Sequence, residues 1–501
     1  MIAITAFAGT GKTSTLVEYA RIRPEWRFLY IAYNKAMQTE AATRFPRNVD
    51  CRTLHSLAYE KIGRSFPTGK IGNNRIWDLS KVLNISEDAQ LQVKSASNLL
   101  SFWLNSNQDN LDIPMLSGYL STLPKAEQQL FSSSVVEHNC LTLAKRLWEL
   151  MLDKTNLVVK MPHDGYLKLF QLSQPIFNID CVMLDEAQDS NDVTLEIINI
   201  AECPHKIVVG DIHQAIYQFR GSKNALADFQ KLANQTFYLT HSFRFNQTIA
   251  AYASLILQYF KAERHAVIGK GFTGEIKLLK SSAKKISTGT TLLARRNATL
   301  FKFAIEALDE GKKVHFAGGI AKYDLDLLTG IANLDIGVAV VHPFVKSFKN
   351  LNTLETYAEN VMENDILMFI KLVKQNTAKK ILATIKELLT FDEWVLANPL
   401  KNIPLCDHLF TTAHRSKGLE FTKVIIADDF NEFYQLIEDN SRSDYLTATL
   451  SSQSRINYEQ EVNLYYVAIT RAKHELLLLH SPINVYLPEL FEECGLISSK
   501  E

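Results

Sequence analysis

The sequence lacks an excess of charge of one sign and closely spaced cysteines. Its 501 residues include 54 Lys plus Arg and 54 Asp plus Glu. A formal net charge of zero excludes a wholly basic nucleic-acid-binding surface, but it allows a local basic groove between acidic faces. The six cysteines never reach C-x-x-C spacing, which argues against a zinc module and favours reduced thiols in a cytoplasmic protein.

Signals for membrane targeting are also missing from the sequence. No stretch approaches about 18 uninterrupted apolar residues, the length that a membrane-spanning helix needs. The apolar start has no basic run before it and meets a glycine-rich loop at once. We therefore expect no membrane span, no secretory signal peptide and a cytoplasmic location.

Short apolar runs alternate with helical patterns along the chain. Runs that are apolar or β-branched over most of their length are typical of parallel strands buried on both faces. The runs that we predict as strands are 28–34, 181–186, 206–211, 422–429 and 474–480. Several end in an acidic or polar residue, and open α/β sheets place their chemistry beyond the carboxyl ends of the strands. Because the runs fall into one group before residue 250 and one mostly after residue 400, we predict two sheets.

Two regions of the chain that lie between predicted strands carry helical patterns instead. Residues 63–150 carry helical patterns such as 91–105 and 140–152, and residues 325–400 carry them again. The chain length predicts roughly three or four domains. We therefore predict an α/β fold with two domains, each interrupted by a mainly helical insertion.

The first chemical motif is the opening loop A-F-A-G-T-G-K-T, from Ala6 to Thr13. Its glycines let backbone N–H groups curl around an anion, and the helix that follows adds its dipole. Lys12 is placed to reach the outer phosphates of a nucleotide, and Thr13 to bind Mg²⁺. Ala6 departs from the glycine of the general pattern, but the later glycines remain. The residues predicted to bind the nucleotide here are Ala8, Gly9, Thr10, Gly11, Lys12, Thr13 and Ser14.

Two further motifs follow predicted strands. In L-D-E-A-Q-D, from Leu184 to Asp189, Asp185 can hold the magnesium ion and Glu186 can orient and deprotonate an attacking water. In the stretch from Val208 to Ser222, Gln214 is suited to sensing a γ-phosphate. Aromatic residues beside an arginine can form a stacking platform for bases; alternatively, the two aromatics of this stretch are half-buried strand residues. The three residues of this platform are Tyr217, Phe219 and Arg220.

The order of all these motifs resembles one family. Together with L-T-H-S-F-R-F (239–245), T-A-H-R-S-K-G-L-E-F (412–421) and N-L-Y-Y-V-A-I-T-R-A-K (463–473), the sequence resembles the UvrD/Rep-like superfamily 1 helicases along nearly its whole length. The sequences of these motifs are most similar to those of the F-box DNA helicase branch. Segments that carry this similarity are I-A-Y-N-K-A (31–36), C-R-T-L-H-S-L-A-Y (51–59), H-D-G-Y-L-K-L-F-Q-L-S (163–173) and V-H-F-A-G-G-I (314–320).

The resemblance implies two RecA-like P-loop domains, with ATP and Mg²⁺ bound between them and single-stranded DNA running across their tops. The domains it implies are 1A (1–62 and 151–250, ATP-binding), 1B (63–150), 2A (251–324 and 401–485), the small insertion 2B (325–400) and a C-terminal tail (486–501).

The resemblance also implies a role for individual residues. Glu186, Gln214, Arg244 and Arg471 look catalytic, with the two arginines acting as fingers on the γ-phosphate because arginine forks stabilise the charge that phosphoryl transfer develops. Glu420 matches the glutamate that holds the ribose, and Phe243 is the residue expected to stack on adenine. The expected DNA contacts are Tyr33, Asn34, Lys35, Thr53, His55, Tyr217, Phe219, Arg220 and His414.

The implied activity is that of an ATP-dependent DNA helicase that translocates 3′→5′ on single strands and at junctions of single- and double-stranded DNA, in repair or recombination. Two alternatives stay open. One is a translocase that strips proteins from single strands or drives a partner protein. The other is an ATP-switched DNA-binding or sensor subunit of a repair or anti-phage defence system. RNA is also open as a substrate, since stacking platforms accept any base.

Some features depart from the family pattern. No F-box segment precedes the loop, so we expect no F-box-type ubiquitin-ligase partner. The glutamine-bearing segment that recognises adenine upstream of the loop is missing, so we expect weak discrimination among nucleoside triphosphates. Insertion 2B is short beside that of many relatives, which leaves its duplex contacts open.

Overall fold

The computed structural model describes residues 1–86, 90–123, 128, 131, 133–216, 225–271, 274–279, 288–360, 363–397, 406–438, 441–450 and 452–493. The chain forms two compact units. Unit 1 comprises Met1–Thr240 and Leu450–Gln460, and unit 2 comprises His241–Thr449 and Glu461–Glu501.

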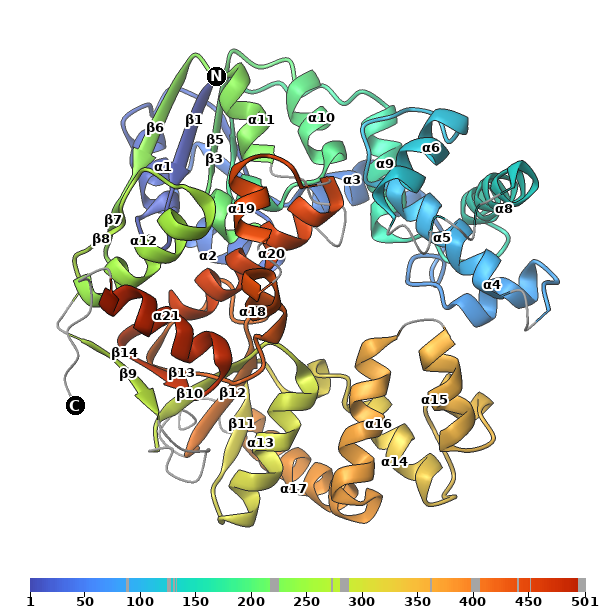
Figure 1. The fold of residues 1–501 in the computed structure, drawn as a ribbon. Helices are drawn as coiled ribbons and strands as arrows, with labels where there is room; N and C mark the ends of the chain where they lie inside the picture. The colour runs from blue at the N-terminus through green and yellow to red at the C-terminus, as the bar shows by residue number, and fades with distance from the viewer. Residues whose placement is uncertain are drawn as a thin grey trace. The chain divides into compact units, whose positions relative to one another are not determined.

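Unit 1 is built on a six-stranded sheet in which every neighbouring pair is parallel (Figure 1). The strand order is β3-β2-β4-β5-β1-β6. The strands are β1 (Ile2–Ala6), β2 (Phe28–Ile31), β3 (Val49–Arg52), β4 (Cys181–Leu184), β5 (His205–Gly210) and β6 (Gln235–Leu239). Parallel strands in such a sheet are covered on both faces, which accounts for the continuous apolar runs of β2, β4 and β5.

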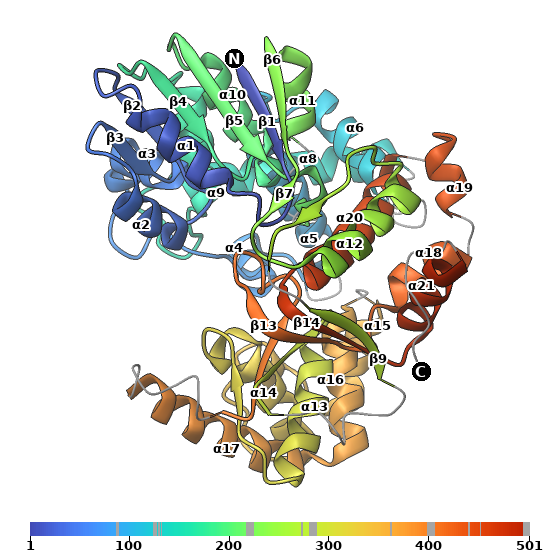
Figure 2. The ribbon, with the colours of Figure 1, turned by 90° about the vertical axis from the view of Figure 1, so that its left-hand side faces the viewer.

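Helices cover both faces of this sheet (Figure 2). On one face, Leu16 and Val17 of α1 pack with Ala41 of α2 against alternate strand residues such as Tyr30 and Met183. On the other face, the intervening strand residues share a core with a second group of helices. The helices are α1 (Lys12–Arg21) and α2 (Lys35–Arg44) on the first face, and α3 (Leu54–Lys61), α9 (His163–Leu172), α10 (Asp192–Ile200) and α11 (Ala225–Leu232) on the second.

The helical insertion of unit 1 shares a hydrophobic core with the sheet. Leu100 and Leu147 of the insertion belong to the same buried cluster as Leu29 and Val182 of the strands. The insertion helices are α4 (Ile76–Val82), α5 (Gln90–Leu104), α6 (Ile113–Thr122) and α8 (Ser134–Leu152), with α5 packed on α8.

A buried lysine joins the chain entering the insertion to the chain leaving it. The Nζ of Lys70 donates to the carbonyl oxygens of Leu150, Asn156 and Val159 at 2.8, 2.7 and 2.7 Å. Its side chain is fully buried. One ammonium group therefore satisfies three carbonyls around and beyond the end of α8.

Replacing Lys70 by Met should destabilise unit 1 by about 3 kcal/mol, because buried carbonyls that lose their donor each cost on the order of 1–3 kcal/mol. The measurement is the free energy of unfolding from urea titration. Lys145→Met is the matched control, since Lys145 lies exposed on α8. Equal unfolding curves for both variants would contradict the assignment of a structural role to Lys70.

Unit 2 contains a second all-parallel sheet of six strands, in the order β11-β12-β10-β13-β14-β9. The strands are β9 (Glu275–Leu279), β10 (Thr290–Ala294), β11 (Val314–Phe316), β12 (His408–Thr412), β13 (Phe421–Ile426) and β14 (Ala472–Leu479). A short parallel pair, β7 (His241–Ser242) with β8 (Ile268–Gly269), stands apart from this sheet.

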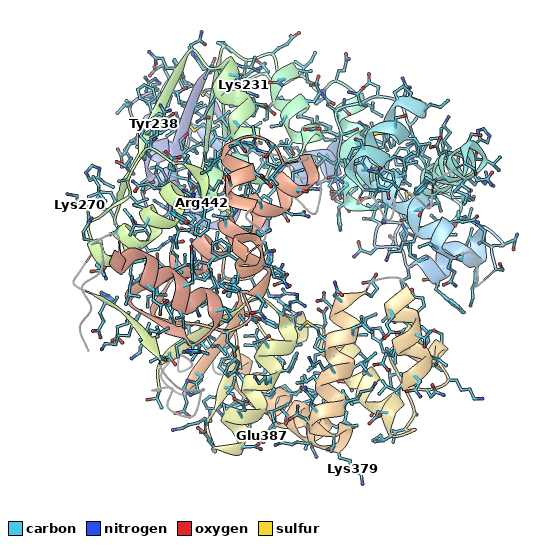
Figure 3. All side chains as sticks on the ribbon, viewed as in Figure 1. Lys231, Tyr238, Lys270, Lys379, Glu387 and Arg442 are labelled. Atoms are coloured by element: carbon cyan, nitrogen blue, oxygen red, sulfur yellow. The ribbon has the colours of Figure 1, made fainter. Side chains whose placement is uncertain are left out.

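Helices of unit 2 pack on its sheet and on one another. Phe301 of α13 and Phe369 of α16 share a buried cluster with Phe316 and Phe410 of the strands. Arg442 of α19, labelled in Figure 3, lies over the Tyr259 ring of α12 at 3.8 Å and donates from Nε to the Tyr259 carbonyl at 2.9 Å. The helices are α12 (Gln247–Lys261), α13 (Asn297–Asp309), α14 (Leu325–Asp335), α15 (Leu351–Asn360), α16 (Asn364–Asn376), α17 (Ala378–Ala397), α18 (Asn431–Glu438), α19 (Ser441–Leu446), α21 (Pro482–Glu493) and the part of α20 (Ser452–Ile469) that begins at Glu461.

The predicted class is confirmed: two parallel sheets are flanked by helices, and all five predicted strands are present. The predicted domain limits remain predictions. None of the helices formed by the described residues combines the length and the apolar character that crossing a membrane requires.

Candidate functional site

The opening loop connects β1 to α1 through two glycines with left-handed backbone. Gly9 has φ 72° and Gly11 has φ 85°, a conformation that favours glycine. Gly11 is the N-cap of α1, and its carbonyl accepts the first helical hydrogen bond from Thr15. The N–H groups of the first turn have no acceptor inside a helix. They and the helix dipole make this end of α1 an anion site that fits the phosphates of a nucleotide.

The strand order brings the carboxylates to this loop. Because β4, β5 and β1 are adjacent and parallel, the segments that follow them lie at the same edge of the sheet. The Oγ1 of Thr13 donates to Oδ2 of Asp185 at 2.9 Å. The Nζ of Lys12 lies 3.2 Å from Oε1 of Glu186. Four predicted site residues from two distant parts of the sequence are therefore in contact.

The charges of this cluster perturb one another. Burial disfavours the ammonium of Lys12, but Glu186, Asp211 and Asp185 outweigh it and raise the pKa of Lys12. Burial and the charge of Glu186 raise the pKa of Asp185, against the opposing effects of Lys12 and of two hydrogen bonds. The pKa of Lys12 is raised because three carboxylates surround it, and that of Asp185 is raised by its burial beside Glu186.

The donor set fits a magnesium–nucleotide complex. The hydroxyl of Thr13 and the carboxylate of Asp185 are hard oxygen ligands, and Mg²⁺ is commonly held by one or two carboxylates together with substrate phosphates and water. Within the described ranges, no group of three or more His, Cys, Asp or Glu side chains could hold a metal by itself. A cation bound by Asp185, Thr13 and phosphate oxygens would also lower the pKa of Asp185, because it favours the ionised carboxylate.

Tyr30 of β2 supports Asp185 from the neighbouring strand. Its hydroxyl donates to Oδ2 of Asp185 at 2.7 Å, and its ring is buried. Burial, followed by the charge of Asp185, raises the pKa of Tyr30, so the phenol stays protonated and remains a donor. The position of the carboxylate is thus fixed by both Tyr30 and Thr13.

Replacing Tyr30 by Phe should raise the Mg²⁺ concentration for half-maximal ATP hydrolysis by about 10-fold, because groups that orient a metal ligand typically contribute 10–100-fold. The measurement is a Mg²⁺ titration at fixed ATP. Tyr19→Phe is the control, since Tyr19 lies on α1 of the same unit and contacts Arg23 and Trp26 rather than Asp185. An unchanged Mg²⁺ requirement in Tyr30→Phe would show that Thr13 alone suffices to orient Asp185.

Glu186 stands in a left-handed backbone conformation, with φ 51° and ψ 42°. This region costs a non-glycine residue on the order of 1–3 kcal/mol and persists only where surrounding contacts impose it. Its N–H donates to Oδ1 of Asp185 at 2.8 Å, and its Oε2 accepts from Nε2 of Gln188 at 2.5 Å. The backbone turn directs the Glu186 side chain toward Lys12 instead of along the strand.

Gln214 ends a short 3₁₀ turn, Ile212–Gln214, that follows β5. Its N–H donates to the Asp211 carbonyl at 2.8 Å, and its Nε2 donates to Oδ2 of Asp211 at 2.7 Å. The predicted stacking platform that follows, Tyr217, Phe219 and Arg220, lies outside the described residues.

In unit 2, the predicted nucleotide residues gather at the amino ends of β13 and β14. Phe421 pairs with Ala472, so Glu420 and Arg471 precede neighbouring strands. The Nε of Arg244 lies 3.1 Å from Oε2 of Glu420, and Nζ of Lys473 pairs with the other carboxylate oxygen. Burial opposes the charge of Glu420, but Lys473 and Arg244 outweigh it and hold its pKa below the usual range.

The guanidinium of Arg471 is held by acceptors of unit 2. It donates from Nε to the Val467 carbonyl at 2.9 Å, from Nη1 to the Leu419 carbonyl at 3.2 Å and from Nη2 to Oγ1 of Thr470 at 3.1 Å. By contrast, Phe243, the predicted adenine contact, is 71 % exposed. The two predicted fingers and the predicted ribose and base contacts therefore belong to one unit, within which Arg244 and Glu420 are in direct contact.

The predicted DNA contacts of unit 1 follow β2 and β3. Tyr33 and Lys35 are exposed, and Asn34 caps α2 by accepting from the Met37 N–H at 2.9 Å. Thr53 is buried and caps α3. Nε2 of His55 lies 3.2 Å from Oδ1 of Asp164 on α9. His414 follows β12 in unit 2. These assignments remain predictions.

Sequence reasoning gave no role to Tyr30, Gln188 or Lys473, although each contacts a predicted site residue. Tyr30 lies inside an ordinary apolar strand, so only the neighbouring position of β2 and β4 reveals it. Gln188 and Lys473 stand inside the motifs named above and could have been assigned a role from their proximity to Glu186 and Arg471.

The fold and the loop define unit 1 as a P-loop nucleotide-binding α/β domain. Comparison with known proteins extends this class to a family. A family model for the UvrD/REP helicase N-terminal domain matches residues 1–235, and one for the UvrD-like helicase C-terminal domain matches residues 338–481. The chain belongs to the UvrD/Rep-like DNA helicase family, with two RecA-like domains.

Individual relatives agree with this assignment. The chain is similar to F-box DNA helicase 1 of Gallus gallus, with 31% identity over 96% of this chain and 47% of the relative. It is similar to F-box DNA helicase protein 1 of Schizosaccharomyces pombe, with 28% identity over 99% of this chain and 57% of the relative. The chain thus spans about half the length of these two proteins. Gabija protein GajB of Bacillus cereus is 24% identical over 98% of this chain and 96% of its own length.

Proposed function

We propose that this chain is an ATP-dependent DNA helicase or translocase that moves 3′→5′ on single-stranded DNA. The observation that carries the proposal is the contact set at one edge of the unit 1 sheet. There, Lys12 meets Glu186 and Thr13 meets Asp185 beside the open N-terminus of α1. This arrangement contains the groups that nucleotide hydrolysis requires.

Each side chain has a role that follows from its chemistry. Lys12 binds the outer phosphates, and Thr13 and Asp185 hold Mg²⁺. Glu186 orients the attacking water and accepts its proton. Gln214 hydrogen-bonds the γ-phosphate and the water. Bound MgATP supplies the phosphoryl group and the divalent charge that stabilises its transfer.

The family resemblance assigns roles in the same reaction to residues of unit 2. Arg244 and Arg471 stabilise the charge that develops on the transferred phosphoryl group, Glu420 binds the ribose and Phe243 stacks on the adenine ring. Because these groups belong to a different unit from Lys12, hydrolysis would require the two units to act together. Such a requirement converts nucleotide binding into domain motion.

The position of the proposed DNA residues supports coupling of DNA binding to hydrolysis. Tyr33, Asn34 and Lys35 follow β2, which neighbours β4, the strand that ends at the Asp185–Glu186 pair. Thr53 and His55 follow β3, which pairs with β2 on the side away from β4. Single-stranded DNA and its junctions with duplex are therefore the proposed substrates, in repair or recombination, with ATP and Mg²⁺ as cofactors.

The test is ATP hydrolysis by the purified chain with no nucleic acid, single-stranded DNA, single-stranded RNA or duplex DNA. We expect the strongest stimulation by single-stranded DNA, and displacement of a strand from duplexes with a 3′ tail but not a 5′ tail. Hydrolysis that ignores every nucleic acid would refute the proposal. Unwinding of 5′-tailed duplexes alone would reverse the polarity.

One structural observation favours a second candidate, an ATP-switched DNA-binding subunit of a larger assembly. Both arginine fingers are engaged by acceptors of unit 2, Arg244 by Glu420 and Arg471 by three groups around it. A chain that rarely released them would bind ATP and DNA while hydrolysing slowly. Single-stranded DNA affinity that depends on ATP, combined with negligible hydrolysis, would favour this candidate over the first.

A further inference from the structure

A glutamine beside the carboxylate pair connects two parts of the nucleotide site that come from different strands. Gln188 is fully buried and follows β4. Its Nε2 donates to Oε2 of Glu186 at 2.5 Å, and its Oε1 accepts from the Asp211 N–H at 2.9 Å. Asp211 follows β5 and in turn accepts from Nε2 of Gln214 through Oδ2 at 2.7 Å.

We propose that Gln188 is a positioning residue that holds Glu186 and the Asp211–Gln214 turn in one fixed arrangement. The inference rests on the proposed function, in which Glu186 activates water and Gln214 senses the γ-phosphate. It adds a residue that acts through these two groups, by its contacts with Glu186 and with the backbone of Asp211.

The chemistry of a primary amide suits this position. One planar group offers a donor to the Glu186 carboxylate and an acceptor to a backbone N–H. A glutamate would keep the acceptor, lose the donor and place a second carboxylate beside Glu186. A methionine of similar length would provide neither bond. An asparagine is one methylene shorter and could not span both partners.

The backbone around Gln188 leaves room for its amide. A Cβ on Gly210 would stand 2.3 Å from Oε1 of Gln188 and 3.1 Å from the Ala187 nitrogen. Only glycine therefore allows β5 to approach this amide so closely. On the opposite side, Gln188 contacts Glu186 in its left-handed conformation, which needs local contacts to persist.

The turn that Gln188 holds is also packed against the phosphate loop. The ring of His213 stacks on Phe7 of the loop, with ring centroids 5.6 Å apart and planes 18° apart. Both side chains are buried. The turn is therefore fixed between the loop and the Gln188 amide, so a shift of Gln214 would be transmitted to Glu186 through Gln188.

The first test removes the donor of the amide alone, in Gln188→Glu, or both the donor and the acceptor, in Gln188→Met. Gln188→Met and Gln188→Glu should each lower the kcat of DNA-stimulated ATP hydrolysis by on the order of 100-fold, because misplacing a catalytic group by about 1 Å has that effect. The KM for ATP and the affinity for a non-hydrolysable ATP analogue should change by less than about threefold, since phosphate binding is untouched. Gly210→Ala should reproduce the loss of kcat from the other strand.

The second measurement does not depend on ATP hydrolysis. Amide hydrogen exchange in a peptide that contains Asp211 should rise in Gln188→Met, which removes the acceptor, but not in Gln188→Glu, which keeps it. Gln171→Met is the matched control. Gln171 is a buried glutamine of unit 1 that donates to Asp109 at 3.3 Å, so its loss should change stability without changing kcat or this exchange.

A double variant tests whether the groups act as one. If Gln188 works through the Asp211–Gln214 turn, Gln188→Met combined with Gln214→Ala should have a kcat close to that of the slower single variant. Multiplicative losses would overturn the inference, and so would an unchanged kcat in the Gln188 variants of a chain that hydrolyses ATP. A wild-type chain with no hydrolysis would overturn the proposed function together with this inference, so the two failures are distinguishable.

Discussion

Replacing Glu186 by Gln should lower the kcat of ATP hydrolysis by about 10³-fold, because positioned general bases contribute on the order of 10²–10⁴-fold. The amide has nearly the same shape as the carboxylate but cannot accept a proton from water. ATP binding should be retained or tightened, since Lys12 now lies 3.2 Å from Oε1 of Glu186 and would be left free for phosphate.

The experiment compares steady-state hydrolysis with the affinity for a fluorescent ATP analogue in wild type and Glu186→Gln. Glu18→Gln is the matched control, because Glu18 is an exposed glutamate of α1, close in sequence to the loop, and pairs with Arg21. A kcat that stays within about twofold of wild type would show that another group activates the water. Lost binding together with lost hydrolysis would instead indicate that Glu186 positions Lys12.

In unit 1, the sequence predicted strands that are buried on both faces, whereas the buried strand β10 of unit 2 was not predicted. β2, β4 and β5 lie in the interior of the unit 1 sheet, and their residues are apolar over most of their length. The edge strands β3 (V-D-C-R) and β6 (Q-T-F-Y-L) were not predicted. β3 is half polar, and the residues of β6 are mostly exposed, so neither forms the continuous apolar run that marks a covered strand.

The sequence could group only those residues of the candidate site that lie within recognisable motifs. Lys12, Thr13, Asp185 and Glu186 were assigned to one site from residue type and motif order, and their contacts at 2.9 and 3.2 Å agree with that grouping. Tyr30 could not be found this way. Its role depends on β2 lying next to β4, although nearly 150 residues of helical insertion and connecting chain separate these strands in the sequence. Strand order is set by packing of the whole sheet, and no local sequence pattern indicates it.

Gln188 illustrates an intermediate case. Its residue type and its place two positions after Glu186 were visible in the sequence, but its second partner is the backbone N–H of Asp211. A backbone partner leaves no side-chain signal. The glycine at position 210 marks the close approach of β5. A single glycine at a strand end is equally typical of an ordinary turn or bulge, so it could not identify this contact from the sequence.

The second large effect is expected from Arg471. Replacing it by Ala should lower kcat by about 10³-fold, since an arginine that stabilises a transferring phosphoryl group contributes on the order of 10³–10⁵-fold. The affinity for ADP should change little, while the affinity for a transition-state mimic such as ADP with a metal fluoride should fall in parallel with kcat. This pattern follows because the guanidinium would act chiefly on charge that develops in the transition state.

Arg471 also has a structural role in unit 2 that the experiment must separate from catalysis. Arg471 donates to the carbonyls of Val467 and Leu419, so its removal also costs unit 2 some stability. Arg442→Ala is the matched control, because Arg442 likewise donates to a backbone carbonyl of unit 2 and lies over the Tyr259 ring. If both variants lower the unfolding temperature and only Arg471→Ala loses transition-state-mimic binding, Arg471 is a finger. If mimic binding survives in Arg471→Ala, its guanidinium serves to join α20 to the segment before β13, and the finger role falls to Arg244.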